Sequence, residues 1–131
     1  MAVIDWRAVG AGARADLAIL APVVAVYAVL HGTGAFHGDA GTVVTAVIAV
    51  LVAPAVGGWV TARRAPPTTP LKHAAIAAGA AVLAYVAFRL ADAVVRHRPI
   101  NGPSVVILVI VSVVFGLLGG FAGRSWQTPR P

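Results

Sequence analysis

Four long apolar stretches dominate this chain of 131 residues and constrain its fold more than any other feature. Each is about as long as a helix that crosses a bilayer, because a hydrocarbon core about 30 Å thick needs about 20 helical residues. Only helices and closed barrels satisfy their backbone hydrogen bonds inside lipid. The sequence therefore predicts an all-α fold, a bundle of four transmembrane helices. The expected spans are residues 17–36, 42–62, 71–90 and 103–122.

The composition supports a membrane protein. Hydrophobic residues make up 60% of the chain and charged residues only 11%. A typical soluble domain is about a quarter charged, so this chain has too little polar surface to face water on all sides. Cysteine is absent, which excludes disulfides and thiolate chemistry, and glutamate is absent as well. The carboxylate side chains are those of Asp5, Asp16, Asp39 and Asp92.

The positive charge predicts how the chain lies in the membrane. The formal net charge is +6, but the basic residues adjoin apolar spans and do not gather on one soluble face. We therefore expect membrane lipids as partners and no nucleic acid. Four crossings place seven basic residues on one side and three on the other, which favours a plasma-membrane protein with both termini in the cytoplasm. The three are Arg89, Arg96 and Arg98.

The chain divides into three expected parts. Residues 1–16 form a cytoplasmic or interfacial segment, residues 17–122 the transmembrane domain, and residues 123–131 a cytoplasmic tail. Asp16 is expected to cap the first span. That span is longer than the apolar region of a typical signal peptide and lacks a clear cleavage site, so we expect it to be a retained helix.

Small residues recur at four-residue spacing in the second and fourth spans. Such positions let helix backbones approach closely, which promotes packing where lipid offers no hydrophobic contrast. They predict either packing within the bundle or a seam for a second copy or a larger membrane complex. The leading prediction is thus a non-catalytic membrane protein that packs through these faces. The candidate packing residues are Ala53, Gly57, Gly58, Gly116, Gly119, Gly120 and Gly123.

A faint internal repeat predicts two helical hairpins of the same orientation. The second span ends in the sequence Val-Gly-Gly-Trp at residues 56–59, and the fourth ends in Leu-Gly-Gly-Phe at 118–121. The first span contains Ala-Val-Tyr-Ala around Tyr27, and the third contains Leu-Ala-Tyr-Val around Tyr85. Sites in membrane proteins with repeats often lie where the repeats meet.

A polar cluster marks the end of the third span. Tyr85, Arg89, Asp92 and Arg96 are spaced by four, three and four residues, so they share one face if the helix continues past the membrane boundary, and Arg98 follows. Arginine forks suit phosphate oxygens, which predicts capture of an anionic lipid headgroup or lipid phosphate, or small-molecule transport. The alternative is that Arg89 extends to the membrane surface and pairs with Asp92.

Other chemistry lacks support in the sequence. His31, His37 and Asp39 share a glycine-rich turn, but their spacing matches no established ligand pattern, so we predict no metal. We also predict no cofactor and no enzyme activity, because no nucleophile–base pair or acid dyad is visible. No carboxylate lies near the middle of an expected span, which argues against a proton-coupled exporter.

The layout resembles a family of small four-helix bacterial membrane proteins typified by YrzE, found in Gram-positive bacteria. The sequence Gly-Gly-Trp-Val-Thr-Ala-Arg at 57–63 and the sequence Gly-Gly-Phe-Ala-Gly at 119–123 carry the resemblance, together with a short link and a third span that opens with small residues. The link is unusually rich in proline here, and Ala74 and Ala75 stand where glycine is expected. The resemblance implies a fold and a membrane location, and no activity. The bias toward alanine, valine and arginine predicts a high-GC actinobacterial source.

Overall fold

The computed structural model describes residues 3–35 and 38–127, and it is built from helices. The helices are α1 (Trp6–Gly32), α2 (Ala40–Arg64), α3 (Pro70–Val95) and α4 (Gly102–Ser125). Each is long and apolar enough to cross a membrane. The described residues contain no strand. The predicted all-α four-helix fold is therefore confirmed.

Capping side chains set the starts of three helices. The Asp5 carboxylate accepts hydrogen bonds from the first backbone N–H groups of α1, Asp39 accepts one in α2, and Asn101 accepts one in α4. The prediction that Asp16 caps the first span is wrong, because α1 already begins at Trp6. Most of the expected N-terminal segment is thus continuous with the first span.

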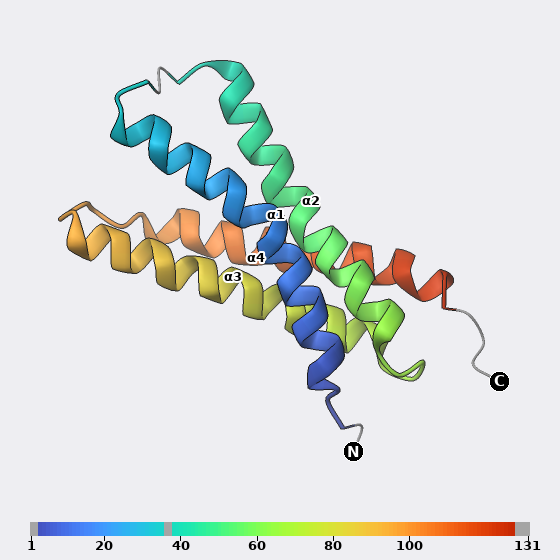
Figure 1. The fold of residues 1–131 in the computed structure, drawn as a ribbon. Coiled ribbons are helices and arrows are strands. Elements are labelled where there is room, and N and C mark those ends of the chain that lie inside the picture. Colours follow the sequence, from blue (N-terminus) through green and yellow to red (C-terminus); the bar gives the residue numbers. More distant parts are fainter. Residues whose placement is uncertain (1–2, 36–37, 128–131) are drawn as a thin grey trace.

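The two hairpins, α1–α2 and α3–α4, cross each other (Figure 1). The largest helix–helix interface is between α2 and α4, and α1 packs against both α2 and α3. The loops that close the two hairpins lie at one end of the molecule, here called the loop end (Figure 1). The start of α1, the α2–α3 link and the end of α4 form the other end, here called the terminal end.

Burial is confined to the terminal half of the bundle. Every buried residue that the structure describes lies within 8–20, 49–82 or 112–123. The described residues of 21–48 and 83–111 include none that is buried, and the two hairpins separate toward the loop end (Figure 1). Side-chain size explains the difference. Residues 74–81 are alanine and glycine except for Ile76, whereas the loop-end halves are rich in bulky valine, leucine and isoleucine, which hold helices apart.

Candidate ligand cavity between the hairpins

The predicted packing residues bring α2 and α4 into backbone contact. A Cβ atom placed on Gly58 would collide with the backbone of Gly116, and one on Gly119 would collide with the backbone of Ala55. A Cβ on Gly123 would lie 2.6 Å from the carbonyl oxygen of Trp59. Only glycine permits so close an approach.

All seven predicted packing residues are buried between helices of this one chain. On α4, Gly120 faces Ala74 of α3, since an added Cβ would lie 2.6 Å from the alanine Cβ. On α2, Gly57 faces α1, where an added Cβ would lie 2.8 Å from the carbonyl oxygen of Gly12. The small-residue faces are therefore occupied inside the bundle and do not lie on its surface.

Where the hairpins separate, they enclose a cavity of about 450 Å³. Its deep wall is apolar and comes from all four helices. Ser112 of α4 is the polar exception there and is 6% exposed. On α2, Val43 and Val47 line the cavity yet are 45% and 52% exposed, so this side is open to the surroundings. The main apolar lining residues are Leu20, Val23, Val24, Val47, Val50, Val82, Phe88 and Leu108.

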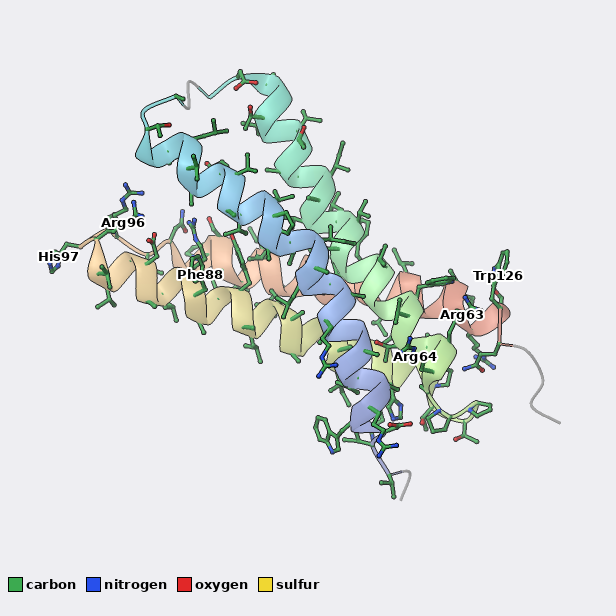
Figure 2. The ribbon with its side chains drawn as sticks, in the orientation of Figure 1. Arg63, Arg64, Phe88, Arg96, His97 and Trp126 are labelled. Atoms are coloured by element: carbon green, nitrogen blue, oxygen red, sulfur yellow. The ribbon has the colours of Figure 1, made fainter. Side chains whose placement is uncertain are left out.

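The end of the cavity toward the loop end is polar. The five residues that the sequence placed in one cluster all line it: Tyr85, Arg89, Asp92, Arg96 and Arg98. Figure 2 shows Arg96 and His97 at the loop end, whereas Arg63, Arg64 and Trp126 lie toward the terminal end. The structure thus joins the predicted arginine cluster to an apolar cavity.

Helix α1 also contributes to the lining of the polar end, and the spacing of the cluster in the sequence does not predict this contribution. Tyr27 and His31 line the cavity, and their rings stack with centroids 4.8 Å apart. The internal repeat could have indicated this arrangement, because Tyr27 and Tyr85 occupy corresponding positions in its two halves. His37, considered together with His31 and Asp39 as a metal ligand, lies outside the described residues.

Charge pairing at this end differs from the predicted alternative. Asp92 pairs with Arg96, whose Nε lies 2.7 Å from the Asp92 Oδ1, and not with Arg89. In the part of the chain that the structure describes, neither Arg89 nor Arg98 has an ion-pair partner. Of the described residues, three arginines and one aspartate line the cavity, so two positive charges are left uncompensated among them.

The fold defines the class of the molecule, a membrane protein made of four apolar helices. The chain matches no protein-family model, no curated protein and no solved structure. The resemblance to YrzE-type proteins therefore stays a prediction.

Proposed function

We propose that this protein binds an anionic amphiphile, such as a phospholipid or a lipid phosphate, in the cavity between its hairpins. The observation that carries the proposal is one cavity with two unlike ends. The deep wall is apolar, and the polar end holds Arg89 and Arg98, which have no carboxylate partner among the described residues. This chemistry matches a molecule that has a phosphate group at one end and a hydrocarbon chain at the other.

The residues that line the polar end carry donor groups suited to a phosphate. Guanidinium groups present several N–H donors in a plane and bind phosphate oxygens in pairs. The Tyr27 and Tyr85 hydroxyls add neutral donors from opposite walls. Because Arg96 is already paired with Asp92, we assign the main charge contacts to Arg89 and Arg98.

The cavity size fits part of a lipid. Small-molecule sites commonly enclose about 300–1,000 Å³, and this cavity falls within that range. It holds a headgroup and the upper part of one chain. The exposed side at Val43 and Val47 lets the remainder of the chain stay in the bilayer. From the uneven distribution of basic residues we infer that the arginine cluster lies on the outer face of the plasma membrane.

The competing proposal, self-association through small residues, has less support. The seven small residues are buried within one chain, so a second copy has no such surface to pack against. Exposed apolar residues elsewhere on the helices are what a lipid-facing surface requires.

Native mass spectrometry of the detergent-purified protein tests the charge contacts. The parent protein should retain phosphatidylglycerol in preference to phosphatidylcholine, and an Arg89→Ala, Arg96→Ala, Arg98→Ala variant should lose that preference. The matched control is Arg7→Ala, Arg64→Ala, Arg124→Ala, three exposed arginines of the terminal end. The proposal fails if the parent shows no preference or if both triple variants lose it equally.

A second pair of variants tests the apolar wall. Val50→Trp fills the cavity and should reduce lipid retention. Val114→Trp is the control, because Val114 is 46% exposed and does not line the cavity. Equal retention by the two variants would show that lipid binds elsewhere.

A further inference from the structure

Asp16 lies inside the tight α1–α2 contact and is 2% exposed. A Cβ atom on Gly57 of α2 would come within 2.9 Å of the Asp16 Cβ, so the aspartate packs directly on a helix backbone. Its Oδ1 is buried without a hydrogen-bond partner. The sequence predicts Asp16 as a helix cap near a span end, whereas the structure places it in the packed core.

The helices around Asp16 offer no neutralising charge. On α2, the nearby Thr61 hydroxyl donates instead to the Gly57 carbonyl oxygen, at 2.8 Å. On α3, the buried titratable group is His73, which contacts Asp5, eleven residues and about 16 Å of helix away from Asp16. The remaining basic groups of α1, α2 and α3 at this end are exposed: Arg7, Arg14, Arg63, Arg64 and Lys72.

An ionised carboxylate in this position would have little contact with water and no counter-ion among the described residues. Burying such a charge is far more costly than burying the neutral acid. The charged form therefore favours an open α1–α2 contact that admits water, and the protonated form favours the closed contact. Carboxyl groups with this property in membrane helices are commonly proton carriers.

We propose that Asp16 is a proton-binding site that couples protonation to packing of α1 against α2. In the closed contact the carboxyl group holds the proton. When the contact opens, the proton passes to a water molecule and leaves a hydrated carboxylate, and closing reverses the transfer. This site is separate from the arginine cluster, so the proposal for Asp16 does not depend on whether the cavity binds lipid.

Leu20 separates Asp16 from the cavity. It follows Asp16 by four residues on the same face of α1, is 9% exposed, and forms part of the deep cavity wall. Any water that enters the cavity therefore comes within one helical turn of the carboxyl group. Leu20 accordingly limits the rate at which that water exchanges protons with Asp16.

Infrared spectroscopy tests the proton directly, since a protonated carboxyl group has a C=O band that a carboxylate lacks. At mildly acidic pH, where an exposed aspartate is ionised, the purified protein should show this band, Asp16→Asn should abolish it, and Asp92→Asn should keep it. An Asp5→Asn, Asp39→Asn, Asp92→Asn variant leaves Asp16 as the only carboxylate side chain and should also keep the band, so the test holds even if Asp16→Asn does not fold. Absence of the band from the parent protein overturns the proposal.

Transfer into D₂O tests whether protons reach Asp16 from the cavity past Leu20. The band should shift slowly in the parent protein and several-fold faster in Leu20→Ala, whereas Leu117→Ala, on the exposed surface of α4, should match the parent. An unchanged rate in Leu20→Ala would rule out proton exchange through the cavity.

Discussion

The backbone N–H of Asp5 donates a hydrogen bond of 2.8 Å to Nε2 of His73. Because Nε2 accepts this bond, the ring proton is on Nδ1, which lies 2.7 Å from the carbonyl oxygen of Thr69 and donates to it. His73 is 1% exposed. Its hydrogen bond with Asp5 joins the start of α1 to the start of α3 across 68 residues of sequence. This contact fixes one edge of the terminal end.

Replacing His73 with leucine should therefore destabilise the fold. The substitution leaves the Asp5 N–H without an acceptor, and a buried unsatisfied donor costs about 1–3 kcal/mol. Thermal unfolding in detergent should show a lower midpoint than the parent protein. His97→Asn is the control, because His97 is exposed and asparagine tolerates its φ of 51°. Equal midpoints for parent and His73→Leu would contradict a structural role.

Glycine-to-alanine substitutions should change stability in opposite directions at closely packed and at unobstructed glycine positions. Gly58→Ala forces a Cβ into the Gly116 backbone, and overpacking of this kind costs about 1–3 kcal/mol. Gly79→Ala meets no atom within 4 Å and should stabilise α3 by about 0.5–1 kcal/mol, because glycine loses more backbone entropy in a helix. Chemical denaturation in detergent measures both. Similar effects at the two positions would contradict the backbone contact between α2 and α4.

Asp92→Asn should strengthen anionic lipid binding with little effect on stability. The substitution removes the one negative charge among the cavity-lining residues and releases Arg96 for the ligand. An exposed pair four residues apart on a helix contributes only about 0.3–0.5 kcal/mol to stability. Titration with phosphatidylglycerol should show tighter binding, and added salt should weaken it. Weaker binding by Asp92→Asn would indicate that Asp92 itself contacts the ligand.

Cysteine labelling should place the loop end outside the cell. The parent chain has no cysteine, so single substitutions report only their own position. A membrane-impermeant maleimide should label Ile100→Cys in intact cells, and Thr68→Cys only after the membrane is opened. Both residues are exposed, so burial does not limit either reaction. The reverse labelling pattern would invert the predicted orientation.

The sequence by itself determined the number of helices and the approximate ends of α2 and α4, whereas α1 begins eleven residues before the expected span. Apolar length and capping are local properties, and so four stretches of about 20 apolar residues specify four helices whatever their neighbours. The spacing of Tyr85, Arg89, Asp92 and Arg96 likewise placed them on one face before any packing was known.

The tertiary structure decided which helices and residues those faces contact. The crossing of the hairpins uses the glycines inside one chain, sets Tyr27 and His31 opposite the arginines, and buries Asp16 against Gly57. It also holds the bulky loop-end halves apart, which creates the cavity. These outcomes depend on contacts between residues far apart in the chain, and helical periodicity shows which residues share a face but not which helix that face contacts.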